Sequence, residues 1–76
     1  GDEQRAQRIA LAYKEELRIS GIVNALNNAR NKLIRKRKQI EESKYIPEEQ
    51  KELLIERMNT RIKEIVTRAN SLMSNL

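Results

Sequence analysis

Apolar residues recur at helical spacing along the part of the chain that follows Pro47. The steps of three or four residues run through Leu54, Met58, Ile62, Ile65, Ala69, Leu72 and Leu76. Such steps place the side chains on one face of an α-helix, close to a heptad seam. Ile55, Val66 and Met73 widen this stripe on one side. The pattern predicts a helix over about residues 47–75, roughly 42 Å long at 1.5 Å per residue.

A second apolar stripe precedes the proline. It runs through Ile19, Ile22, Leu26, Ala29, Leu33 and Ile40, with Val23 and Ile34 on its flanks. Farther upstream, Ile9, Leu11 and Ala12 form a weaker stripe. We interpret the whole stretch as one helix over about residues 3–42.

The Ser20-Gly21 pair leaves a second interpretation of this stretch open. Glycine inside a helix costs about 1 kcal/mol relative to alanine, so it can mark a break or a kink. A turn at this pair would divide the chain into three helices instead of two.

The stretch SKYIPEE, residues 43–49, is the clearest break in the pattern. Proline disfavours helix at the residue before it and fits the first position of a new helix. A turn at about residues 43–46 between two long amphipathic helices predicts an all-α, antiparallel helical hairpin that occupies residues 1–76 as one unit. In this hairpin, a residue of the first helix and the residue that faces it on the second have numbers that add up to about 89. Ile19 would then face Ala69, and the second helix would end beside Leu11–Tyr13.

The seam is wider than two helices can cover, which predicts assembly into a larger helical bundle. The partner would be further copies of the chain, as in a coiled-coil homo-oligomer, or a larger protein. The residues predicted to make the helix contacts are Ile22, Leu26, Leu33, Leu54, Met58, Ile62, Ile65 and Leu72.

Composition argues against catalysis and against bound cofactors. The 76 residues include no Cys and no His, which removes thiolate and imidazole ligands and the commonest general base. The glutamates near the turn resemble a solvated acidic face more than a metal site, since carboxylate metal sites in helical bundles add histidine. The serine and threonine hydroxyls have no base beside them. We therefore predict no catalytic residue, no metal, no cofactor, no small-molecule substrate and no enzyme activity.

The positive charge is concentrated in one segment. The net charge of +5 lies within residues 29–44, because residues 1–28 and 45–76 each balance to zero. Six bases stand in the run RNKLIRKRKQ: Arg30, Lys32, Arg35, Lys36, Arg37 and Lys38. The first interpretation is a solvated face paired with Glu52 and Glu56 of the second helix, worth a few tenths of a kcal/mol per pair.

The alternative interpretation of the basic run is a small nucleic-acid-binding module. These six side chains would follow phosphates without reading bases, since the chain has no zinc finger and only two aromatic residues. A helix on a membrane surface is a third and weaker interpretation. The longest apolar run, Ile9–Tyr13, is far shorter than the roughly 20 residues of a membrane span. The sequence shows no signal peptide.

Four asparagines lie in the stretch NALNNARN, residues 24–31. They fit a polar outer face, or hydrogen bonds across an interface between chains, where a buried asparagine fixes register. Asn27 and Asn31 are one turn apart and would then act together. The irregular cluster, with Ile46 as a poor N-cap, is atypical of an idealised designed bundle.

Residues 34–70 resemble helical hairpins of very large phage internal proteins, namely the ejection proteins of short-tailed phages and some tape-measure proteins. The shared pattern is a basic helix end, Ile40 with Ser43, then Pro47 with two glutamates, and Ala69-Asn70 at its close. Ile46 and Gln50 depart from it. The resemblance implies a virion location, assembled helical tubes or bundles, and no catalytic role. The start at Gly1 without Met fits a fragment or a processed product.

Overall fold

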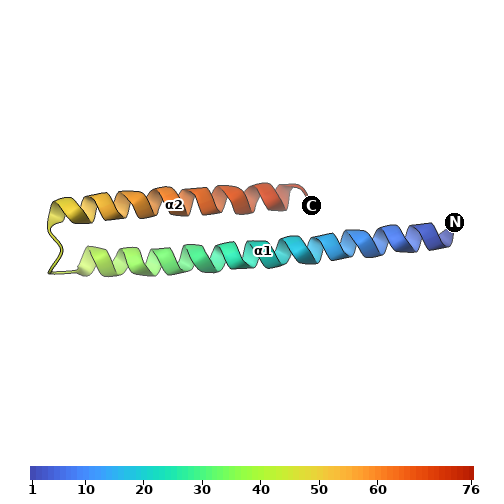
Figure 1. Cartoon of the computed structure of the whole chain (residues 1–76), viewed down its shortest axis with the longest axis horizontal. Helices are drawn as coiled ribbons and strands as arrows, with labels where there is room; N and C mark the ends of the chain where they lie inside the picture. The colour runs from blue at the N-terminus through green and yellow to red at the C-terminus, as the bar shows by residue number, and fades with distance from the viewer.

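The computed structural model covers all 76 residues. The chain forms two helices that run antiparallel (Figure 1). Helix α1 covers Asp2–Glu42 and helix α2 covers Glu48–Ser74, with a short connection at 43–47. The molecule measures 67 × 15 × 9 Å along its principal axes, so it is a rod one helix thick in its shortest direction. The predicted all-α helical hairpin is confirmed.

Helix α1 continues through Gly21 without interruption. All of its 41 residues are helical, and no residue of the chain has a positive φ angle. A Cβ atom added to Gly21 would meet nothing within 4 Å, so no close neighbour requires glycine there. The three-helix alternative, with a turn at Ser20-Gly21, is therefore wrong.

The connection is held by a small set of hydrogen bonds. The backbone N–H of Ser43 donates to the carbonyl of Ile40 (3.2 Å) where α1 ends, and the N–H of Tyr45 donates to Ser43 Oγ (3.2 Å). Pro47, at φ −59° and ψ 146°, starts α2, and its carbonyl accepts from the N–H of Lys51 (2.9 Å). Proline is suited to this place because it has no N–H to leave unpaired.

Lys51 also ties the two helices together across the connection. Its Nζ donates to the carbonyl of Glu41 (3.1 Å) and lies 3.6 Å from Glu48 Oε1. The last turn of α1 carries no basic residue of its own. A cation at that position satisfies one free carbonyl and opposes the negative end of the helix dipole.

The apolar core is very small. Only Ile19, Val23, Ile65 and Ala69 are buried, at 3–9% exposure. Ile19, Val23 and Ala69 form one cluster, against which Leu26 and Leu72 pack. Ile19 and Ala69 therefore meet as predicted, but the contacts Arg37–Asn59 and Lys51–Glu41 have facing numbers that sum to 96 and 92 and not to about 89, so α2 lies a few residues closer to the connection than the predicted register.

The side of α1 that packs on α2 differs from the predicted stripe. Ala29 is exposed, whereas Val23, expected on a flank, is buried. The less exposed positions follow alternating steps of four and three through Ile19, Val23, Leu26, Arg30, Leu33, Arg37 and Ile40. Leaving Ala29 exposed loses the burial of only one methyl group, while the observed set of positions turns the larger side chains toward α2. Arginine is tolerated in this set because its aliphatic stem packs while its head reaches solvent.

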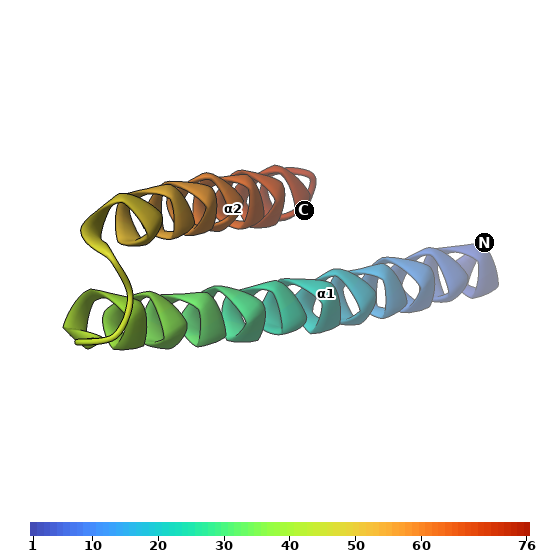
Figure 2. The same cartoon turned by 60° about the vertical axis from the view of Figure 1, so that its left-hand side comes forward.

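Helix α1 extends beyond the end of α2 (Figure 2). The difference of 14 residues between the two helices corresponds to about 21 Å at 1.5 Å per residue. Leu76 lines the same hollow as Ile19 and Ser20, so the chain ends at that level. The expected end beside Leu11–Tyr13 is wrong, because α2 lies several residues closer to the connection than the predicted register and the last two residues leave the helix.

We call residues 2–18 of α1 the overhang. Its main internal ion pair joins Arg18 to Glu15, with Nη2 2.6 Å from Oε1 and Nε 3.0 Å from Oε2. The hydrogen bonds from Arg18 hold the pKa of Glu15 below its ordinary value, and the same contact raises the pKa of Arg18. Both side chains are more than half exposed, so this pair contributes little to stability.

Replacing Gly21 with alanine should stabilise the protein by about 1 kcal/mol, because an exposed glycine inside a helix carries an entropic cost that alanine lacks. Thermal unfolding followed by circular dichroism at a fixed protein concentration measures this change. The matched control is Ala25→Gly, an exposed position of the same helix, which should lose a similar amount. A loss of stability in Gly21→Ala would contradict an unbroken α1.

Candidate assembly interface

The eight predicted contact residues lie on the facing sides of the helices to different degrees. Ile65 is buried at 3% exposure, and the others are half-buried: Ile22, Leu26, Leu33, Leu54, Met58, Ile62 and Leu72. Half-burial means that each of these side chains still presents apolar surface to solvent. The hairpin therefore uses its seam only in part.

The buried residues all lie in the half of the hairpin that is far from the connection. In the half near the connection, the facing side of α1 carries arginine where a heptad would place an apolar residue. Arg37 donates from Nη1 to Asn59 Oδ1 at 2.6 Å, which is the one hydrogen bond between a side chain of α1 and a side chain of α2. The sequence analysis missed Asn59. The repeat Val23–Arg30–Arg37, at seven-residue steps, was the signal for this geometry.

Arg30 occupies the preceding position of the same repeat. Its Nη2 donates to Asn31 Oδ1 at 3.3 Å, but its Nε is buried and has no hydrogen-bond partner. A buried donor without an acceptor loses its hydration and gains nothing in return. Arg30 therefore weakens the packing at this level of the hairpin.

The expected pairing of the basic run with the acids of α2 is wrong. The three ion pairs of the structure are Arg18–Glu15, Lys51–Glu48 and Arg61–Glu64, and each lies within a single helix. None includes a base of the run. Arg30 and Arg37 turn toward α2 and are half-buried, whereas the other four bases point outward and are exposed: Lys32, Arg35, Lys36 and Lys38.

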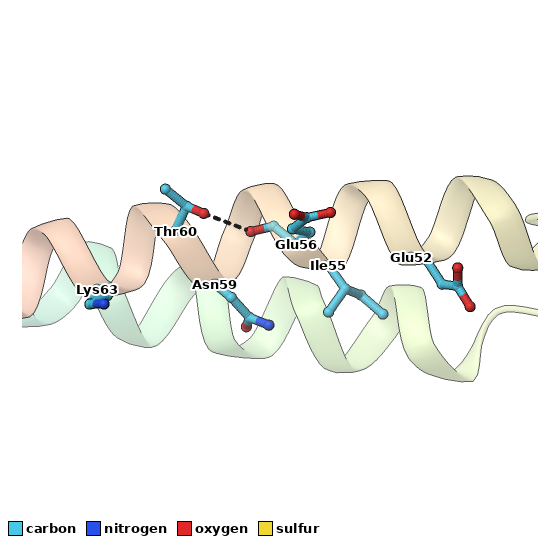
Figure 3. Close-up of a pocket in the computed structure, with 6 residues that line it drawn as sticks. All are labelled: Glu52, Ile55, Glu56, Asn59, Thr60 and Lys63. Carbon is cyan, nitrogen blue, oxygen red and sulfur yellow. Dashed lines mark hydrogen bonds between the residues drawn. The ribbon is translucent and has the colours of Figure 1, made fainter.

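Glu52 and Glu56 line a shallow groove along one flank of α2 (Figure 3). Asn59, Thr60 and Lys63 continue it, and Ile55 is its one apolar member. Thr60 Oγ1 donates to the carbonyl of Glu56 at 3.1 Å. The groove is open to solvent and mixes acids with a base, so it has the character of a helix flank and not of an enclosed ligand site.

The asparagine cluster faces mostly outward. Asn24, Asn28 and Asn31 are exposed, and Asn27 is half-buried. No hydrogen bond joins Asn27 to Asn31 in the single chain, and the amide of Asn31 accepts from Arg30 instead.

Large apolar side chains remain on the surface at several places. More than half of the side chain is exposed in Ile9, Leu11, Tyr13, Leu17, Tyr45, Leu53, Met73 and Leu76. Four of these eight lie in the overhang. Two more, Met73 and Leu76, border the hollow beside Ile19 at the end of α2.

No group of three or more His, Cys, Asp or Glu residues is placed to hold a metal ion. Neither helix combines the length and the apolar character that a membrane span requires. In comparisons with known proteins, no family model, no curated protein and no solved structure matches the chain.

Replacing Arg30 with leucine should raise the free energy of unfolding by about 1–2 kcal/mol, because it removes the unpaired buried donor and adds apolar contact. Denaturant unfolding at a fixed protein concentration measures the gain. Lys32→Leu is the matched control: the same change at an exposed position should stay within about 0.5 kcal/mol. Destabilisation by Arg30→Leu would show that the guanidinium holds the helices together.

Proposed function

We propose that this chain is a non-enzymatic structural element that works by self-association, building a helical assembly from copies of the hairpin. The observation that carries the proposal is the small extent of burial. Only four of 76 residues are buried, and every one of them is aliphatic. A core of this size seldom stabilises a small domain by more than a few kcal/mol, so such domains usually depend on oligomerisation or another constraint.

The surface area supports the same proposal. The chain exposes 6623 Å², whereas a compact monomer of 8.9 kDa exposes about 4,800 Å². The excess is larger than the roughly 800 Å² that each partner contributes to a standard protein interface. Docking on a larger protein would cover the same surface, and it is the outcome to consider if the chain does not bind itself.

The resemblance of residues 34–70 to hairpins of phage internal proteins gives this proposal a biological setting. We propose a virion or the DNA-ejection apparatus of a phage as the place of assembly. Long, thin hairpins that self-associate are suited to tubes and bundles, because each copy offers surface along its whole length.

Thermal stability should depend on protein concentration if the folded state is an oligomer. Because association favours the folded form by mass action, raising the concentration about 100-fold should raise Tm by roughly 10 °C. Circular dichroism melts between about 5 and about 500 µM test this expectation. A Tm that is independent of concentration would argue for a monomer and against the proposal.

A second candidate function is non-specific nucleic-acid binding by the basic run. It is favoured by one observation, namely that no acid forms an ion pair with any of the six bases. Lys32, Arg35 and Lys36 are all exposed and lie at i, i+3 and i+4, so they share one outer face of α1. Such a patch fits phosphates on one side of a duplex.

If this patch binds DNA, affinity for a short duplex should fall steeply with salt. Replacing Lys32, Arg35 and Lys36 together with alanine should reduce the slope of log K against log salt by about 2 to 3. Fluorescence anisotropy with a labelled duplex gives the slope.

The matched control removes the same charge from exposed positions of α2, by alanine at Arg57, Arg61 and Arg68. Equal losses in the two triple variants would mean that net charge alone attracts the DNA. Absence of binding at low salt would reject this second function.

A further inference from the structure

Four of the exposed apolar residues of the overhang share one face of α1, whereas Ile9 and Leu11 lie on other faces. Ala6, Ala10, Tyr13 and Leu17 follow at steps of four, three and four, which places them on one face of α1. All four are exposed, with Tyr13 at 61% and Leu17 at 56%. We call this set the overhang stripe.

The overhang stripe points away from the side of α1 that packs on α2. At 100° per residue, its centre lies about 130° around the helix from Ile19 and Val23. Continuing the α2-facing repeat upstream of Ile19 leads to Glu16, Ala12, Ile9, Arg5 and Asp2, of which only Ile9 is large and apolar. A longer α2 would therefore not cover the stripe, and its partner must come from another direction.

The overhang also has a reason to need a partner. Its 17 residues correspond to about 25 Å of helix at 1.5 Å per residue. Most helical stability in proteins comes from packing of an amphipathic face, and every residue of the overhang is exposed in the single chain. Covering the stripe would therefore stabilise the helical conformation of the overhang.

We propose that a second copy of the chain covers it, with the two overhangs packed antiparallel on their stripes. In this arrangement the facing residue numbers sum to about 23, so that Ala6 faces Leu17 and Ala10 faces Tyr13 of the partner. Each small side chain then meets a large one, which is the complementarity that close helix packing requires. This inference rests on the proposed self-association and specifies its geometry.

Charge selects the antiparallel direction. Residues 1–28 carry no net charge, so two overhangs meet without repulsion. The whole +5 lies in residues 29–44. Parallel pairing would bring two basic runs side by side, whereas antiparallel pairing puts them at opposite ends of the dimer, far beyond the Debye length of roughly 10 Å. Antiparallel helix dipoles also attract each other.

The shape of the dimer tests this geometry. One hairpin is 67 Å long. Two hairpins that overlap by about 20 residues would measure about 105 Å, at 1.5 Å per residue. Small-angle X-ray scattering on the wild-type chain, combined with light scattering for mass, should find a dimer of this length. A dimer about as long as one hairpin would overturn the inference.

Substitutions separate this inference from the proposed function. Tyr13→Lys with Leu17→Lys should weaken dimerisation at least about tenfold in Kd, measured by sedimentation equilibrium. Leu11→Lys is the control, because Leu11 is equally exposed at 67% but lies about 130° away from the stripe. It should dimerise like the wild type.

The possible outcomes distinguish self-association in general from the antiparallel contact between overhangs. If the wild type is an oligomer and the double variant remains one, self-association stands and the overhang contact is overturned. If the wild type is a monomer at every concentration, both are overturned. Circular dichroism of each variant confirms that α1 and α2 are still helical, so that loss of the dimer is not loss of the fold.

Discussion

The contact between α1 and α2 around Ile19, Val23, Ile65 and Ala69 is the interaction on which the rest of the hairpin depends. It is the one place where side chains of both helices leave the solvent. Burying an aliphatic side chain stabilises by about 1.5–3 kcal/mol, while ordering each residue costs about 1–2 kcal/mol of backbone entropy. A contact of four residues is a weak support for two helices of 41 and 27 residues. This imbalance is the reason for proposing that the hairpin associates with a partner.

In the half of the hairpin near the connection, where arginines replace apolar residues on the facing side of α1, polar contacts join the two helices. Lys51 joins the start of α2 to the last carbonyls of α1, and Arg37 joins Asn59. These contacts give the hairpin a defined register near the connection without much gain in stability, because exposed hydrogen bonds add little. The arginines also keep a positive charge on the seam. The buried apolar contacts are thus concentrated at the other end of the rod, where the overhang begins.

The sequence was sufficient for the fold and for much of the seam. Two long periodic stretches around Pro47 define the helices and their antiparallel arrangement, since proline can start a helix but interrupts one that is under way. Gly21 looked like a break because glycine has poor helix propensity, but a penalty of about 1 kcal/mol is too small to interrupt a long helix.

The details of the interface were harder to read from the sequence. Ala29 fits the apolar pattern better than Arg30, because a hydrophobicity pattern does not accept arginine as an inward position, although the arginine stem packs well. The expected ion pairs with Glu52 and Glu56 failed for a related reason. Arg37 donates a hydrogen bond to the neutral side chain of Asn59, and four other bases lie on the outer side of α1. Periodicity gives the side of a helix but not the partner of a long, flexible side chain.

The central claim is that the hairpin is incomplete alone and associates through apolar surface. Light scattering after size exclusion, at low and at high salt, tests it most directly. Apolar association is little affected by salt, whereas contacts between exposed charges are screened. We expect an oligomer whose mass is the same at both salt concentrations. A folded monomer, or an oligomer that dissociates at high salt, would contradict it.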